Sequence, residues 1–185
     1  MLSTSKKAAE VGSLGVTSAV STSAAAAAAS PATGLAKRHQ AQQEALVTIA
    51  LGLADGGEAK RWVLLGTDYV YPRTTNNILE SYLKSKGIPE EDIFVNYTPF
   101  GHSDWATIVA DVVALGADGK QVGVISTING DANIGFYKEL AAAGVSADDI
   151  PVVAFSVGEE ELSGLDTSNL VGHLAAWNYF QSAET

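Results

Sequence analysis

From Lys60 to the C-terminus, short apolar runs alternate with segments of helical periodicity. This alternation constrains the fold more than any other feature, because strands separated by helices form βαβ units around a mostly parallel sheet. Five strands are predicted, over Trp62–Gly66, Ile93–Tyr97, Val122–Ser126, Val152–Ser156 and Leu170–Leu174. Because crossovers between parallel strands are right-handed, few topologies remain. We therefore expect an α/β fold in three layers, with a mostly parallel five-stranded sheet covered on both faces.

Helices are predicted between these strands. In the best-defined one, Ser103 or Asp104 is the expected N-cap and Gly116 ends the helix. Its apolar stripe follows the i, i+3, i+4 spacing, with Trp105, Ile108, Val109, Val112 and Val113. Further helices are predicted over Thr75–Lys86 and Asn133–Ala143, with a short helix start at Glu159–Leu162.

The composition of the chain changes near Lys37. Residues 1–36 hold Lys6, Lys7 and one acid, Glu10, in a run of Ser, Thr, Gly and Ala. This pattern is typical of a low-complexity extension or of a targeting segment. Residues 37–58 are interpreted as a linker, in which Gln42–Leu53 can be written as a helix with Leu46, Ile49, Ala50 and Leu53 on one stripe. The sheet domain is assigned to residues 59–185.

Charge and composition exclude several classes of protein. The formal net charge of −10 argues against a nucleic-acid or anionic-membrane surface. The chain has no cysteine, which excludes disulfides and zinc-ribbon sites, and its three histidines have no metal-ligand spacing. We expect no metal and no cofactor.

Unusual side chains follow the ends of the predicted strands. The first such segment, Gly66–Thr74, is predicted as an aromatic loop that leads into a helix. The carboxyl ends of parallel strands meet at one edge of the sheet, where ligands bind in open α/β folds. We therefore expect a ligand crevice at this edge.

Each candidate in the crevice has an alternative interpretation. Tyr69 and Tyr71 offer flat faces and hydroxyls to a ligand, but alternate residues of an extended loop can also be core aromatics. Asn129 can present its amide or simply form a turn. Glu159-Glu160-Glu161 suits an acidic first helical turn, although one of the three can face the crevice.

Catalytic templates are mostly absent from the sequence. We find no G-x-S-x-G, P-loop, G-x-G-x-x-G or H-E-x-x-H motif. Asp68, Asp104, Asp131 and Glu159 could supply a carboxylate pair, but acids at loop starts are common helix caps. His102 is expected in a loop near a cap and His173 in a strand. A small, polar, neutral molecule held without chemistry suits the remaining groups better.

Five stretches carry a resemblance to a known family: GTDYVYPRTTNNIL, YTPFGHSDW, STINGDANIGFYKEL, IPVVAFSVGEEEL and LVGHLAAWNYFQS. They resemble the urea and short-chain-amide substrate-binding proteins of ABC transporters. These proteins belong to the type 1 periplasmic-binding-protein group, within the branched-chain amino-acid transporter superfamily. The resemblance runs from about Lys60 to the C-terminus and weakens between Gln42 and Gly57.

The resemblance implies a non-catalytic protein of two α/β lobes that close on a ligand, of which this chain is similar to the second lobe, with flavodoxin-like strand order. It also implies a periplasmic location and permease subunits as partners, with the first lobe missing or replaced by a dimer partner. The ligand-binding residues that it implies are Asp68, Tyr69, Tyr71, Asn129, Ser156 and Glu159.

Two alternatives to a transporter component are open at this point. A cytoplasmic amide-sensing regulator shares the fold, and an export signal would distinguish the two. A hydrolase using Asp68 or Glu159 is the third hypothesis, and turnover of urea or acetamide that is abolished by Asp68→Ala would support it.

Overall fold

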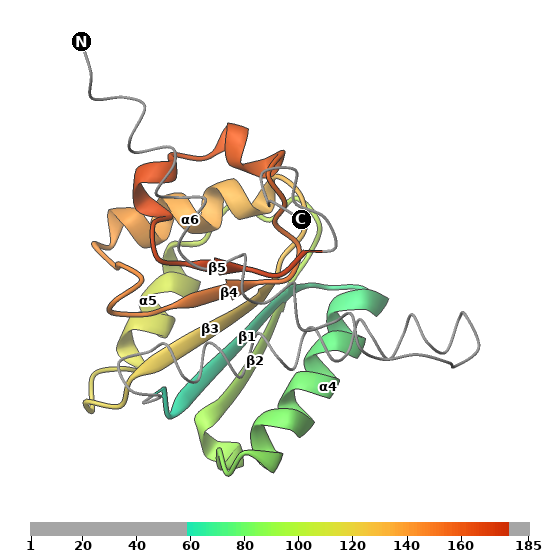
Figure 1. Cartoon of the computed structure of the whole chain (residues 1–185), viewed down its shortest axis with the longest axis vertical. Helices are drawn as coiled ribbons and strands as arrows, with labels where there is room; N and C mark the ends of the chain where they lie inside the picture. The colour runs from blue at the N-terminus through green and yellow to red at the C-terminus, as the bar shows by residue number, and fades with distance from the viewer. Residues whose placement is uncertain (1–58, 178–185) are drawn as a thin grey trace, which may run out of the picture.

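A computed structural model of the protein describes residues 59–177, which form one parallel α/β sheet domain (Figure 1). All strand pairings are parallel, and the strand order is β2-β1-β3-β4-β5. The predicted α/β class, the five-stranded sheet and the flavodoxin-like order are therefore confirmed. The elements are β1 (Arg61–Thr67), α4 (Val70–Ser85), η2 (Glu90–Asp92), β2 (Ile93–Thr98), α5 (Ala106–Ala114), β3 (Val122–Thr127), α6 (Ala132–Ala142), β4 (Val152–Ala154), η3 (Glu161–Gly164), η4 (Thr167–Asn169) and β5 (Leu174–Ala175).

The helices lie on both faces of the sheet, which makes three layers (Figure 1). Side chains alternate across the central strand β1, so that Val63 and Leu65 belong to the core beneath α5 and α6. Trp62 and Leu64 belong to the core beneath α4 on the opposite face. Both faces of β1 and β3 are buried, as a parallel sheet requires.

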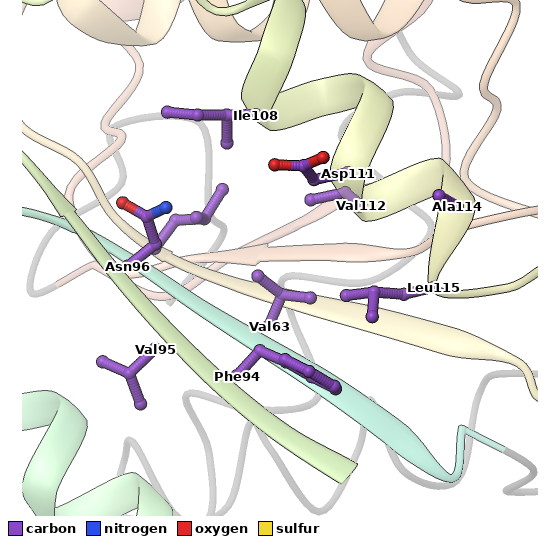
Figure 2. A pocket seen from close by; sticks show the side chains of 10 residues that line it. Val63, Phe94, Val95, Asn96, Ile108, Asp111, Val112, Ala114 and Leu115 are labelled. Atoms are coloured by element: carbon purple, nitrogen blue, oxygen red, sulfur yellow. The ribbon is translucent and has the colours of Figure 1, made fainter. Parts of the chain in front are cut away.

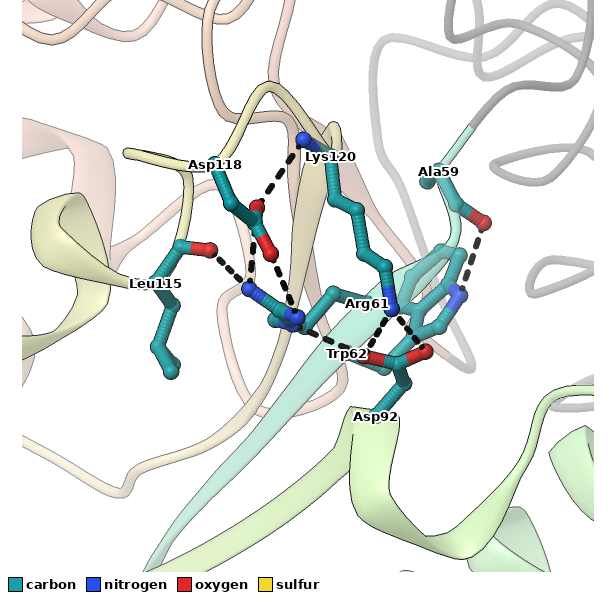
Figure 3. Close-up of polar contacts among 7 residues, drawn as sticks. All are labelled: Ala59, Arg61, Trp62, Asp92, Leu115, Asp118 and Lys120. Atoms are coloured by element: carbon teal, nitrogen blue, oxygen red, sulfur yellow. Dashed lines mark hydrogen bonds and ion pairs between the residues drawn. The ribbon is translucent and has the colours of Figure 1, made fainter.

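A charged cluster ties the amino end of β1 to two neighbouring loops (Figure 3). The Asp92 carboxylate, whose side chain is 4% exposed, accepts from Arg61 Nε at 2.9 Å and from Lys120 Nζ at 2.7 Å. Arg61 also donates to the Leu115 carbonyl and pairs with Asp118 at 3.0 Å. The Lys120 ammonium and the Arg61 guanidinium hold the pKa of Asp92 below its usual value. The cluster therefore joins η2, β1 and the loop before β3 in the charged state.

Helix α4 begins at Val70 and not at Thr75. The prediction placed Pro72 in a loop, but proline is accepted in the first helical turn because the N–H that it lacks has no partner there. Tyr69 is the N-cap residue with extended backbone, and Tyr71 lies in the first turn of the helix. The expectation of an extended loop through Thr74 is therefore wrong.

The predicted cap of α5 is also wrong. The N-cap residue is Trp105, no side chain caps the helix, and Ser103 and Asp104 precede it. Burial explains the difference, because Trp105 is fully buried against Phe136 of α6 and fixes the start of the helix by packing. Along the predicted stripe, Val109 and Val112 are buried whereas Val113 is exposed.

The last elements are shorter than predicted. Strand β4 ends at Ala154, and β5 comprises Leu174–Ala175 instead of Leu170–Leu174. Gly172 has a φ of +94°, which is incompatible with a strand. His173 therefore precedes β5, where its Nδ1 accepts a hydrogen bond from the Val152 N–H. The predicted helix start at Glu159–Leu162 is a 3-10 helix that begins at Glu161.

Three predictions lie outside the described residues: the extension over residues 1–36, the linker over residues 37–58 and the helix over residues 42–53. Within residues 59–177, no helix is long and apolar enough to cross a membrane.

Candidate functional site

The loops that follow β1, β2 and β3 are joined by hydrogen bonds at the carboxyl edge of the sheet. Thr67 of β1 pairs in register with Thr98 of β2, and the Asp68 N–H donates to the Thr98 carbonyl at 2.7 Å. The buried Thr67 hydroxyl accepts from the Asn129 N–H at 3.0 Å. These bonds hold the predicted crevice residues in one place.

Tyr69 and Asn129, which the sequence names as candidates, are in direct contact. The Tyr69 hydroxyl donates to Asn129 Oδ1 at 3.1 Å, and Asn129 Nδ2 donates to the Thr127 carbonyl at 2.8 Å. The amide therefore makes a local turn contact and also supports the tyrosine. Each of the two partners keeps free capacity, a hydroxyl lone pair on Tyr69 and one N–H on Asn129.

Tyr71 connects the first turn of α4 to the end of β4. Its hydroxyl donates to the Phe155 carbonyl at 2.9 Å and lies 3.5 Å from the Ser156 hydroxyl. Burial raises the pKa of Tyr71 above its usual value, so the phenol is neutral at physiological pH. Ser156 itself is buried beside this bond.

A row of three aromatic rings borders these polar groups. The ring of Tyr69 lies between Tyr71, at 6.1 Å between centroids, and Phe100, at 5.0 Å. Phe100 is 65% exposed in the loop after β2. Phe100 was expected at the crevice edge from its position after β2, the strand paired with β1, but it was not among the predicted ligand-binding residues.

The candidate carboxylates are placed differently from the neutral groups. Asp68 is exposed and accepts from Arg73 Nε at 2.6 Å, and this guanidinium lowers the pKa of the carboxyl. Glu159 is half-buried in the loop after β4. In the same loop, Glu161 Oε2 accepts from the Gly158 N–H at 2.9 Å. Within residues 59–177, the Asp68 carboxylate accepts from Arg73 and not from Tyr69, Tyr71 or Asn129.

Gly66 allows the close packing beneath the site. A Cβ at this position would lie 2.6 Å from Thr127 Oγ1 and 2.8 Å from Pro72 Cβ. The absence of a side chain thus lets the first turn of α4 sit directly on β1 and β3. Tyr71 reaches the end of β4 from this turn.

Within residues 59–177, no group of three or more His, Asp or Glu side chains is arranged to hold a metal ion. His102 is a loop residue, as expected, and its Nε2 contacts the Asp104 carbonyl at 2.8 Å. What the cluster of Tyr69, Tyr71 and Asn129 offers is hydroxyls, one amide and aromatic faces, all uncharged. This arrangement can hold a small polar molecule by hydrogen bonds and stacking.

A separate apolar groove of about 460 Å³ lies between α5 and the edge strand β2 (Figure 2). Its lining includes Val63, Phe94, Ile108 and Val112, and Asp111 is the charged residue in it. None of the residues that line the groove belongs to the hydroxyl and amide cluster. The groove is therefore distinct from the candidate site.

The model of a family described as a periplasmic binding protein domain matches residues 38–185, which is more than half of the chain.

Proposed function

The chain belongs to the periplasmic binding protein domain family, and on this premise we propose that it binds urea or a short-chain amide at the carboxyl edge of its sheet. Solute binding is the function that the family indicates. We base the choice of ligand on the position of the Tyr71 hydroxyl, which is held between Phe155 and Ser156.

The free hydrogen-bonding capacity of the site favours a ligand rich in N–H groups. The Tyr69 and Tyr71 hydroxyls each donate to a protein oxygen, so what their oxygens can offer a ligand is acceptor capacity, which on Tyr71 is shared with the Ser156 hydroxyl at 3.5 Å. Asn129 keeps one N–H for a carbonyl. A planar molecule with several N–H donors and one carbonyl acceptor matches this set, whereas a carboxylate ligand does not.

The charges around the site support a neutral ligand. Asp68 is the nearest acid in the sequence, and its ion pair with Arg73 neutralises it. An amino acid, with its ammonium and carboxylate, would find no unpaired partner in this cluster. The uncharged cluster favours an amide over an amino acid.

We also propose the setting in which such binding is used. A periplasmic binding protein hands its solute to membrane permease subunits, so we expect a periplasmic location and permease partners. The site residues line one side of an open edge, and an opposing protein surface would complete the enclosure of the ligand.

Titration calorimetry of the full chain tests the proposal. We expect saturable binding of urea and acetamide in the millimolar range, and no binding of glycine at the same concentrations. Tyr71→Phe should weaken the binding about tenfold, which corresponds to one lost hydrogen bond of about 1.4 kcal/mol.

Tyr82→Phe is the matched control, because it removes a hydroxyl from the same helix away from the site. An absence of saturable urea or amide binding would refute the proposed ligand. Equal loss in the two variants would refute the role of Tyr71.

A further inference from the structure

Strand β2 has an open outer edge. In the part of the chain that the structure describes, β2 pairs with β1 alone and forms one side of the sheet (Figure 1). The strand contains no charged residue and no proline, and its register with β1 runs without a bulge. Charges, prolines and bulges are the devices that keep natural edge strands from pairing with other chains. Because β2 has none of them, its edge is open to pairing with another strand.

The exposed side chains of β2 are apolar on both faces of the sheet. Phe94 is 38% exposed and lies on the α5 side, beside Val63 of β1. Val95 is 42% exposed and lies on the α4 side, beside Leu64. The apolar groove of Figure 2 adjoins Phe94. Contiguous exposed apolar surface of this kind marks a protein interaction site.

The backbone of β2 determines which residues can pair across this edge. The Thr98 carbonyl accepts from the Asp68 N–H, so the backbone groups of Thr98 point toward the β1 side. The N–H and C=O of one residue point to the same side of a strand, and successive residues alternate. The backbone groups of Ile93, Val95 and Tyr97 therefore point outward, with Val95 in the middle.

We propose that two copies of this chain pair through their β2 strands, antiparallel, about a two-fold axis at Val95. In this register all the outward-pointing residues meet each other, because Val95 faces Val95 of the second copy and Ile93 faces Tyr97. Residues that face each other in this way exchange both backbone hydrogen bonds. A two-fold contact needs a surface that is complementary to itself, and the outer edge of β2 meets this condition.

The side chains fit the same register. On the α5 side, Phe94 of each copy faces Asn96 of the other copy, and Asn96 lines the apolar groove. Each Phe94 ring therefore extends the apolar lining of the opposite groove. On the α4 side, the two Val95 side chains meet at the axis. Although the chain has a formal net charge of −10, the paired strands bring no like charges together, because β2 has no charged residue.

The dimer leaves the candidate binding site of each copy open. Because the two sheets run in opposite directions, their carboxyl edges lie at opposite ends of the dimer. The second copy is therefore not the opposing surface that would enclose the ligand. The inference does not rest on the proposed ligand, and it predicts the same urea affinity in monomer and dimer.

Light scattering after size exclusion of the full chain tests the pairing. We expect a dimer at roughly 100 μM chain, where a contact with a micromolar dissociation constant is populated. Val95→Lys should raise the dissociation constant of the dimer at least about 100-fold, because it places two like charges at the axis. Val171→Lys is the matched control, since it changes an exposed valine that precedes β5, the strand at the other side of the sheet, and it should leave the dimer intact.

Crosslinking tests the position of the axis. Because the chain has no cysteine, a single introduced thiol reacts without interference. The Cα atoms of a hydrogen-bonded antiparallel pair lie about 5.5 Å apart, so a short bismaleimide should join two copies of Val95→Cys. The same reagent should give no covalent dimer of Val171→Cys.

Several results would overturn the proposal. One is a monomeric wild type at this concentration, and another is a dimer that Val95→Lys and Val171→Lys leave equally intact. If Val95→Lys does not fold, the crosslinking decides, and a folded Val95→Cys variant that forms no covalent dimer refutes the pairing. A monomer whose Val95→Cys thiol reacts slowly would show that other residues of the same chain cover the edge, which also contradicts the proposal.

Discussion

The two ends of β1 carry polar clusters of opposite character. At the amino end, Arg61, Asp92 and Lys120 form a charged cluster in which each charge has an opposite partner (Figure 3). At the carboxyl end, Tyr69, Tyr71 and Asn129 are neutral, and Tyr69 and Asn129 keep unused acceptor and donor capacity. The charged groups at the amino end are paired with one another within the protein. The neutral groups at the carboxyl end leave hydrogen-bonding capacity for a ligand.

This difference shows why charge alone does not identify a binding site. The most strongly charged cluster in the described residues joins loops and stabilises the fold. The candidate site depends on hydroxyls whose donors are committed within the protein, and the Tyr69 oxygen keeps acceptor capacity for a ligand. The comparison predicts that changes at the amino end alter stability alone and that changes at the carboxyl end alter binding.

Asp92→Ala should give the largest effect and would break the amino-end cluster. It leaves Arg61 and Lys120 without their shared partner at a site where the carboxylate is 4% exposed. We expect the thermal midpoint to fall by roughly 10 °C in scanning calorimetry. Urea affinity, measured at a temperature where the variant is folded, should be unchanged.

Asp118→Asn is the control for this experiment, because Asp118 pairs with the same Arg61 but is half exposed. Its effect should be much smaller. A loss of ligand affinity in Asp92→Ala without a loss of stability would contradict the division between the two ends.

Gly66→Ala tests the carboxyl end and should have the next largest effect. The added Cβ would lie under 3 Å from Thr127 Oγ1 and Pro72 Cβ, so α4 must shift away from β1. We expect a loss of about 1–3 kcal/mol in the free energy of unfolding. Guanidinium chloride is the denaturant for this measurement, because urea is the proposed ligand. Because Tyr71 moves with α4, ligand binding should weaken as well.

Gly116→Ala is the matched control, since its added Cβ would meet only ordinary contacts of 3.5 Å and longer. This substitution should leave both stability and binding nearly unchanged. If Gly66→Ala kept wild-type binding, the position of Tyr71 would not depend on the packing of α4 on β1.

The sequence predicted the sheet well because its signals are local. The apolar runs at Trp62 and Val122 are buried on both faces, and this pattern identifies central parallel strands directly. The start of α4 was missed because the sequence does not show that Pro72 lies in the first turn. The start of α5 was missed because tertiary packing of Trp105, not a polar cap, sets it.

Site residues were predicted by position, but their contacts were not predictable. Placing Tyr69, Asn129 and Ser156 after parallel strands suffices to bring them to one edge. Which atoms meet depends on register and helix placement, such as the pairing of Thr67 with Thr98 that brings Phe100 near Tyr69. The roles of these residues in ligand binding remain predictions.

The smallest expected effect on stability is the pH dependence that comes from His173, at the amino end of the sheet. Its imidazole packs beside Tyr137 and accepts from the Val152 N–H, and burial lowers its pKa from 6.5 to about 4. The unfolded chain therefore binds a proton at a higher pH than the folded one, so stability falls as pH decreases from about 6.5 to about 4. The pKa values of the Asp92 and Asp118 carboxyls are lowered below 3.8, so their cluster weakens only below this window.

Between pH 7 and pH 5 we expect a loss of about 1–2 kcal/mol in the free energy of unfolding attributable to His173. It is measured as the difference between wild type and His173→Asn in denaturation. Parallel pH profiles of the two proteins would show instead that the carboxylates govern stability throughout.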